Sequence, residues 1–254
     1  MVTVSQNVVV VASTVAFSLL GLAVLNHLWP WQKRQKYNGL ITWQGSILGT
    51  TYAVMLGFML YTVWTEYGEA NRNVCEEASA VVNLYRLSYG LPDPQRTELQ
   101  RLARAYTDSV ITQGRTRMVR GEATEQTTAL STEMWETVMS IKAASPTESS
   151  AQGHVMTELE TIAQHRLIRN LQSRDRLPGL LWAVLLASGV LTIVSLCMFA
   201  TENLKLQAFQ VLCLSFLVSL SLVAIADIHR PFYGLIHVGD SSFQRVQHTM
   251  QAPY

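Results

Sequence analysis

Residues 179–200 read GLLWAVLLASGVLTIVSLCMFA and contain no charged side chain. A helix needs roughly 20 mostly apolar residues to cross the hydrocarbon core of a bilayer, so this run predicts a membrane-spanning helix. The runs 8–29, 46–64 and 206–226 meet the same criterion, and buried helices of a water-soluble protein are a poor alternative for uncharged runs this long. The run at 8–29 has no basic segment before it and is too long for a cleaved signal peptide, so we interpret it as a retained helix.

The composition supports a membrane protein and excludes other classes. Charged residues make up 15% of the 254-residue chain, against about 25% in globular proteins. The chain carries 19 Lys and Arg against 18 Asp and Glu, and a net charge of +1 argues against a nucleic-acid partner bound by phosphate neutralisation. Three cysteines, Cys75, Cys197 and Cys213, are not a disulfide framework.

The lengths of the connections divide the chain into four segments. The predicted helices form a first transmembrane hairpin in 1–64 and a second in 178–228. A long segment, 65–177, separates the hairpins, and 229–254 is a C-terminal tail. With four crossings, both termini and the long segment fall on one side of the membrane.

Basic residues close to the membrane favour the cytoplasmic side. The short-loop side carries Lys33, Arg34, Lys36 and Lys205. The other side carries Arg72, Arg166, Arg169, Arg174, Arg176, Arg230 and Arg245. The larger set predicts that the termini and 65–177 are cytoplasmic, whereas the tight cluster at 33–36 argues for the reverse orientation.

The long segment is predicted to be helical, which makes the whole chain all-α. Its apolar residues recur at helical spacing rather than alternating as in a strand. The stripes are Val74, Ala78, Val81, Tyr85, Ser88; Leu99, Leu102, Ala103, Tyr106, Val110; Leu130, Met134, Val138, Ile141; and Val155, Leu159, Ile162, Leu171. Breaks are predicted at 90–94, where Gly and Pro end a helix, and at 145–153.

The second spanning run carries a ridge of small residues. Gly45, Gly49, Ala53 and Gly57 recur every fourth position, which places them along one face of a helix. Small residues allow a neighbouring helix to approach closely in lipid. We therefore predict that this ridge packs against another helix in a homo-oligomer.

A second face of the same helix has the pattern of a pore lining. Thr51, Met55, Phe58 and Thr62 share that face, and Glu66 and Glu69 extend it beyond the apolar run. Apolar constrictions gate pores by dewetting, and acidic rings favour cations, so the four residues predict a pore lining and the two carboxylates its mouth. A lipid-facing or core stripe is the alternative, because Thr hydroxyls can bond carbonyls of their own helix.

No motif indicates an enzyme, a cofactor or a metal site. The chain has no phosphate loop and no nucleophile elbow. His154 and His165 are not at metal-ligand spacing, and Glu76 and Glu77 are interpreted as a solvated helix face. We expect no catalytic residue, no cofactor and no metal.

Several short motifs carry a resemblance to a known family. They are WTEY (64–67), EA (77–78), LYR (84–86), LP (91–92), RLIRNLQSRDRL (166–177), LW (181–182) and DIHRPFYG (227–234). In these residues and their order the chain resembles the bacterial bestrophin-like domain family, a group distantly related to bestrophin ion channels.

The resemblance implies a homopentameric ion channel in the bacterial inner membrane. In bestrophins the second helix lines the pore and apolar residues form a neck, so the implied partners are lipid, inorganic ions and further copies of the chain. It does not imply an ion preference. A membrane-anchored signalling or interaction scaffold without conduction is the alternative function.

Overall fold

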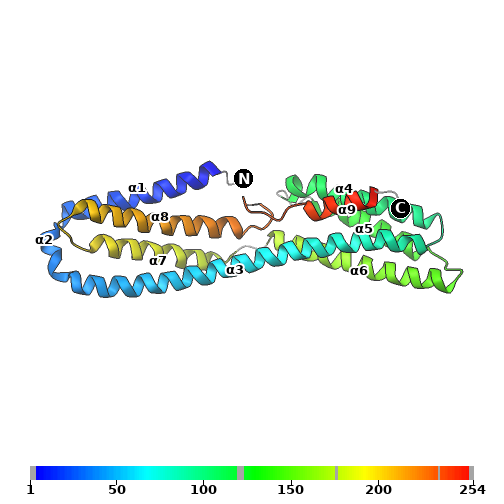
Figure 1. The fold of residues 1–254 in the computed structure, drawn as a ribbon, viewed down its shortest axis with the longest axis horizontal. Coiled ribbons are helices and arrows are strands. Elements are labelled where there is room, and N and C mark those ends of the chain that lie inside the picture. Colours follow the sequence, from blue (N-terminus) through cyan, green and yellow to red (C-terminus); the bar gives the residue numbers. More distant parts are fainter. Residues whose placement is uncertain (1–3, 119–122, 175–176, 234, 252–254) are drawn as a thin grey trace. The chain divides into compact units, whose positions relative to one another are not determined.

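Every regular element that the structure describes is a helix. The structure is a computed structural model that describes residues 4–118, 123–174, 177–233 and 235–251. Its helices are α1 (Val4–Leu28), α2 (Trp31–Arg34), η1 (Gln35–Tyr37), α3 (Asn38–Leu87), η2 (Ser88–Gly90), α4 (Gln95–Met118), α5 (Ala123–Met139), α6 (Pro146–Arg174), α7 (Gly179–Met198), α8 (Leu204–Ile228) and α9 (Ser241–Gln251) (Figure 1). The predicted all-α fold is confirmed.

The chain divides into two compact units. The first, Met1–Glu66 with Arg176–His229, holds α1, α2, α7, α8 and the first part of α3, and is called the membrane unit below. The second, Tyr67–Asp175 with Arg230–Tyr254, holds the rest of α3 with α4, α5, α6 and α9, and is called the extramembrane unit.

Four helical stretches are long and apolar enough to cross a membrane. They are Val4–Leu28, Trp31–Gly90, Gly179–Met198 and Leu204–Ile228. Pro178 stands at the N-cap of α7, where its missing N–H costs no hydrogen bond, and the Asn203 side chain accepts from the Leu206 N–H to start α8. The four predicted spanning helices are confirmed.

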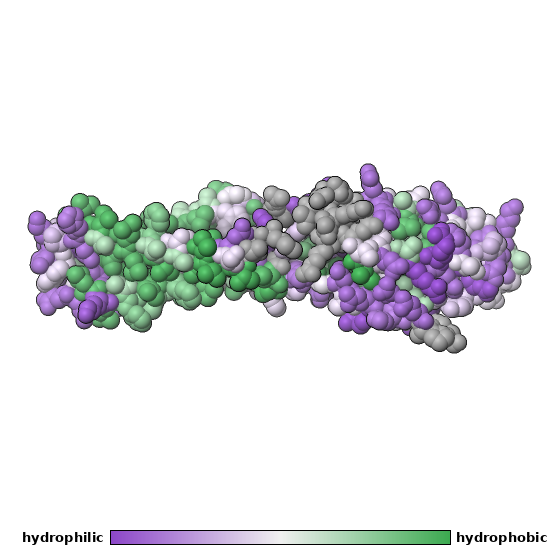
Figure 2. Space-filling model, turned by 90° about the horizontal axis from the view of Figure 1, so that it is seen from above, coloured by the Kyte–Doolittle hydropathy of each residue, from purple (hydrophilic) through white to green (hydrophobic). Residues whose placement is uncertain are grey.

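The membrane unit has a small core and an apolar exterior. The buried residues of the core are Leu22, Tyr52, Ile193, Cys197, Val211 and Val218. Large apolar side chains such as Phe17 and Leu180 stay more than 70% exposed, at 77% and 75%. Figure 2 shows apolar side chains over these helices and hydrophilic ones over the extramembrane unit. Such an exterior fits hydrocarbon rather than water.

The extramembrane unit is a helical bundle whose core follows the predicted stripes. The stripes on α3, α4 and α5 are buried apart from a half-buried Leu130, and so are Val155, Leu159 and Ile162 of α6. Leu171 is the exception, because its side chain is 55% exposed near the end of α6. The prediction that Leu171 joins this stripe is therefore wrong.

The break predicted at 145–153 is also wrong, because α6 already begins at Pro146. Ser145 Oγ accepts the Glu148 N–H at 3.2 Å, and the Glu148 carboxylate accepts the Ala144 N–H at 2.7 Å. This exchange resembles a capping box, with Pro at the first helical position. The polar residues that suggested a loop are the start signal of the helix.

The C-terminal segment contains a helix that the sequence did not indicate. α9 buries Phe243, Val246 and Met250 in the core of the extramembrane unit. Arg104 of α4 donates from Nη2 to the Met250 carbonyl at 3.1 Å, which places a cation at the C-terminal end of α9. Side-chain packing and this cap fix α9 against the bundle.

Candidate functional site: helix α3 and a buried ion pair

The inner face of α3 is formed by residues that the sequence did not single out. Tyr52 is 3% exposed and Val63 is 0% exposed, and they stand about three helical turns apart. A Cβ at Gly189 would lie 3.0 Å from Tyr52 Oη, so the glycine lets the phenol ring lie close to α7. Within one chain, this face of α3 packs against the other membrane helices.

The predicted pore-lining residues lie mostly outside that contact. Thr51 and Thr62 are exposed, and Phe58 is 69% exposed. Met55 differs, because it is half-buried against the core of the membrane unit. The Thr62 hydroxyl donates to the Phe58 carbonyl at 2.9 Å, so it is satisfied without water or an ion. Glu66 and Glu69, the predicted mouth residues, are both exposed on α3.

The small-residue ridge divides into an inner and an outer part. A Cβ at Gly45 would lie 3.0 Å from Ser195 Oγ, so Gly45 makes a close contact with α7 of the same chain. A Cβ at Gly49 or Gly57 would meet nothing within 4 Å, and Ala53 is exposed. The outer three residues are therefore free to meet lipid or another subunit.

A buried arginine holds the C-terminal end of α7. Arg34 of α2 is 0% exposed, and its Nη1 donates to the Cys197 carbonyl at 2.9 Å. Its Nη2 donates to Asn26 Oδ1 of α1. The last carbonyls of a helix lack partners and carry partial negative charge, so a guanidinium there is favourable. The sequence placed this residue in the basic cluster at 33–36 but gave no indication that it is buried.

Two amide side chains complete this cap. Asn38 at the start of α3 donates from Nδ2 to the Ala200 carbonyl at 2.7 Å and accepts the Ala200 N–H on Oδ1 at 3.0 Å. Gln207 of α8 donates from Nε2 to the Cys197 carbonyl at 3.2 Å. Residues from three elements therefore satisfy the backbone where α7 ends, which matters most where water is scarce.

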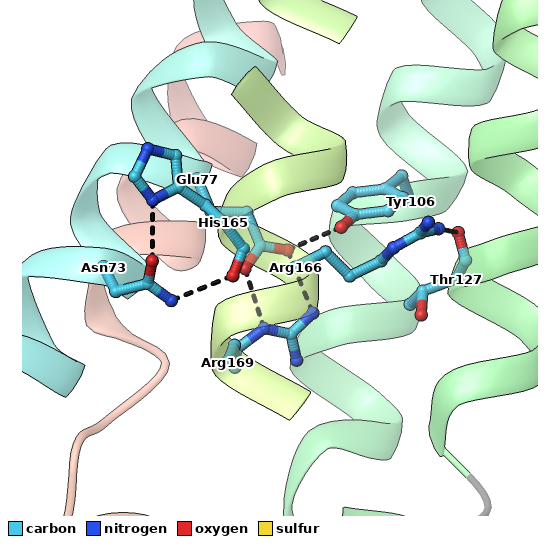
Figure 3. Close-up of polar contacts among 7 residues, drawn as sticks. All are labelled: Asn73, Glu77, Tyr106, Thr127, His165, Arg166 and Arg169. Atoms are coloured by element: carbon cyan, nitrogen blue, oxygen red, sulfur yellow. Dashed lines mark hydrogen bonds and ion pairs between the residues drawn. The ribbon is translucent and has the colours of Figure 1, made fainter. Parts of the chain in front are cut away.

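The extramembrane unit contains a buried ion pair with a tyrosine (Figure 3). Glu77 of α3 is 0% exposed, and Arg169 of α6 is 4% exposed. Arg169 donates from Nε to Glu77 Oε2 at 2.7 Å and from Nη2 to Oε1 at 2.9 Å. Tyr106 of α4 donates its hydroxyl to the same carboxylate at 2.5 Å. The prediction that Glu77 faces solvent is wrong.

The environment fixes the protonation states of Tyr106 and Arg169. Burial raises the pKa of the Tyr106 phenol well above its usual range, and the Glu77 carboxylate raises it further. Burial alone would lower the pKa of the Arg169 guanidinium, but the adjacent Glu77 carboxylate raises it above the ordinary value. The phenol therefore stays neutral and the guanidinium charged, so this cluster is a permanent link between α3, α4 and α6 rather than an acid–base pair.

Beside the ion pair, α6 contacts α3 and α5 through two further side chains (Figure 3). His165 Nδ1 lies 2.6 Å from Asn73 Oδ1, and Asn73 Nδ2 donates to the His165 carbonyl at 2.9 Å. Arg166 donates from Nη1 to the Thr127 carbonyl of α5 at 2.8 Å. Within the described part of the chain, no group of three or more His, Cys, Asp and Glu side chains is arranged to hold a metal ion.

Comparison with known proteins gives a family and a fold. The model of the Bestrophin-like domain matches residues 12–243. A structure of a bacterial bestrophin homolog from Klebsiella pneumoniae, carrying a point mutation, is similar with a TM-score of 0.74 at 15% identity and covers 97% of this chain and 100% of that chain. A second variant of that homolog gives a TM-score of 0.71 at 17% identity, covering 93% of this chain and 97% of the other.

A structure described only as a membrane protein is similar with a TM-score of 0.72 at 15% identity, covering 97% of this chain and 98% of that one. No curated protein matches the chain. At these identities the solved structures show a shared fold, whereas the family model spans most of the sequence. The resemblance stated from the short motifs is confirmed, and the chain belongs to the Bestrophin-like domain family.

Proposed function

We propose that this protein is an oligomeric ion channel whose pore is lined by α3. The observation that carries the proposal is Phe58, a large aromatic side chain that is 69% exposed in the middle of a membrane helix. The chain's own helices pack on Tyr52 and Val63 instead, so the face with Thr51, Phe58 and Thr62 is left for an axis shared between copies.

The proposed neck is a ring of Phe58 side chains, with Met55 beside it. A ring of apolar groups excludes water at a narrow point and closes a pore without a moving gate. Family membership and the fold shared with a bestrophin homolog support this arrangement. The proposal includes no catalytic residue, metal or cofactor.

Flux through purified protein in liposomes with opposed ion gradients tests the proposal. We expect ion movement that depends on protein and is absent from empty liposomes. No flux, together with an oligomer in which Phe58 faces lipid, would favour a membrane-anchored scaffold.

Replacing Glu66 and Glu69 with Gln should reduce cation preference without abolishing flux. Both carboxylates are exposed on α3, and a ring of them concentrates cations over a Debye length of about 8 Å at physiological salt. Reversal potentials in planar bilayers measure the change. Gln at the exposed Glu136 of α5 is the control, and an unchanged reversal potential in the double variant would remove the two residues from the mouth.

We propose a symmetric homo-oligomer, with five subunits, in which the outer ridge of Gly49, Ala53 and Gly57 meets a neighbour. Leu at Gly49 and Gly57 should weaken the assembly, because a Cβ there meets nothing in the isolated chain and bulk would push a neighbouring helix away. Light scattering in detergent measures the change in mass. Leu at the exposed Ala226 of α8 is the control on another membrane helix, and an unchanged mass and thermal stability of the Gly49 and Gly57 variant would exclude this face.

We also propose that both termini and the extramembrane unit lie in the cytoplasm of a bacterial cell, beneath the inner membrane. A single cysteine introduced at the exposed Lys33 or Lys36 should then react with an impermeant maleimide in intact cells. This cysteine is introduced into a variant in which the three native cysteines, Cys75, Cys197 and Cys213, are replaced by Ala or Ser. Reaction only after permeabilisation would establish the reverse orientation.

A further inference from the structure

The hydrogen bonds around His165 determine which ring nitrogen carries a proton. Asn73 is 5% exposed and donates its Nδ2 to the His165 carbonyl at 2.9 Å, which fixes the orientation of its amide. Its Oδ1 then faces His165 Nδ1 at 2.6 Å. Because a carbonyl oxygen only accepts, Nδ1 must carry a hydrogen. A neutral ring at this position is therefore unprotonated at Nε2.

The second ring nitrogen faces a carboxylate. His165 Nε2 lies 3.4 Å from Glu76 Oε2 of α3. A neutral ring presents a lone pair to that carboxylate and gains nothing, whereas an imidazolium keeps its Nδ1 contact with Asn73 and attracts the carboxylate through its charge. The site is thus complementary to the protonated ring. We propose that His165 is a proton-binding site, and that the bound proton ties α6 to α3 through Glu76.

The neighbouring titratable groups are Glu77, Tyr106, Arg166 and Arg169, and each already has a hydrogen-bond partner. Glu77 and Arg169 neutralise each other, and Arg166 turns toward α5, where it donates to the Thr127 carbonyl (Figure 3). Glu76 is therefore the carboxylate that pairs with a protonated His165.

Proton binding gives the contact between α6 and α3 a dependence on pH with a definite sign. The imidazolium carries a charge opposite to that of the Glu76 carboxylate, 3.4 Å away, whereas the neutral ring keeps only its contact with Asn73. Acid therefore tightens α6 against α3. The inference concerns the extramembrane unit alone and does not rest on conduction.

Hydrogen exchange of the full-length protein in detergent at pH 5.5 and 8.0 tests the tightening. After correction for intrinsic exchange, protection of the α6 amides around His165 should be roughly two- to fivefold greater at pH 5.5, the scale of a partly exposed ion pair. Glu76→Gln and His165→Gln should each abolish that difference. The control is His154→Gln, because His154 is exposed on the same helix and should leave the difference intact.

Nitrogen-15 NMR of protein labelled at histidine reads the proton positions directly. The neutral His165 ring should carry its hydrogen on Nδ1, and Glu76→Gln should leave this tautomer unchanged. A neutral ring with its hydrogen on Nε2 would overturn the inference, and so would an equal pH dependence of protection in the wild type and Glu76→Gln.

Discussion

Replacing Phe58 with Ala should raise ion flux through the protein by at least about tenfold. The phenyl ring is 69% exposed on the proposed pore face, and its removal widens and wets the narrowest apolar section. A barrier lower by about 1.4 kcal/mol is enough for a tenfold increase in rate. Liposome flux and single-channel current, compared with wild type at equal protein, measure the effect.

The matched control for this prediction is Phe209→Ala. Phe209 is 63% exposed on α8, so the same atoms are removed from another membrane helix, and flux should not change. If neither the wild type nor Phe58→Ala conducts, and the axis of the oligomer is plugged, the channel proposal fails. Equal increases from both substitutions would indicate a general loosening of the membrane unit rather than a neck.

Arg169→Met should destabilise the extramembrane unit by about 3–5 kcal/mol, because it leaves the Glu77 carboxylate buried without its partner. Glu77 is 0% exposed and takes both hydrogen bonds of the guanidinium fork. A loss of this size lowers the melting temperature by roughly 10 °C in a chain of about this length. Thermal unfolding followed by circular dichroism measures the effect.

Removing all three partners together should restore most of the loss. The variant with Glu77→Leu, Arg169→Met and Tyr106→Phe has neither a buried charge nor an orphaned hydroxyl, and apolar replacements of buried ion pairs are often neutral. The control is Arg101→Met, because Arg101 pairs with Glu98 on the surface of α4 and its loss should change little. A triple variant as unstable as Arg169→Met would show that packing, not charge, is the cause.

The sequence predicted the architecture because the lengths of the uncharged runs and the spacing of the apolar stripes both indicated helices. Uncharged runs of membrane length have few alternatives, and the stripes on α3, α4 and α5 entered the core of the extramembrane unit. The breaks were harder to predict. At Ser145 and Pro146, polar residues typical of loops are also typical of helix starts, and only the exchange with Glu148 distinguishes the two.

The buried ion pair escaped prediction because its partners are 92 residues apart. The spacing of residues within one helix does not identify an ion-pair partner on a helix so far along the chain. One indication was available: Glu77 lies on the apolar stripe between Val74 and Val81, and Arg169 follows Ile162 by two helical turns. A charge on such a stripe implies a buried partner.

The two candidate faces of α3 were identified from spacing alone, and both remain predictions for the assembled protein. Spacing relates residues to each other around a helix but does not say which face the chain's own neighbours cover. The face of α3 that the chain's own helices cover is a third one, with Tyr52 and Val63. Its position leaves Phe58 uncovered and draws Met55 partly inward.

The capped end of α7 has a consequence for how the protein is made. Arg34 and Asn38 belong to the first hairpin, yet their acceptors at Cys197 and Ala200 are 163 and 162 residues further along the chain. At ribosomal speeds of about 5–20 residues per second, those acceptors are synthesised roughly 10–30 seconds later. During that interval Arg34 has only its contact with Asn26 of the first hairpin, and the Nη1 hydrogen bond to the Cys197 carbonyl forms after the second hairpin has been made. The final packing at this end of the membrane unit therefore requires both hairpins.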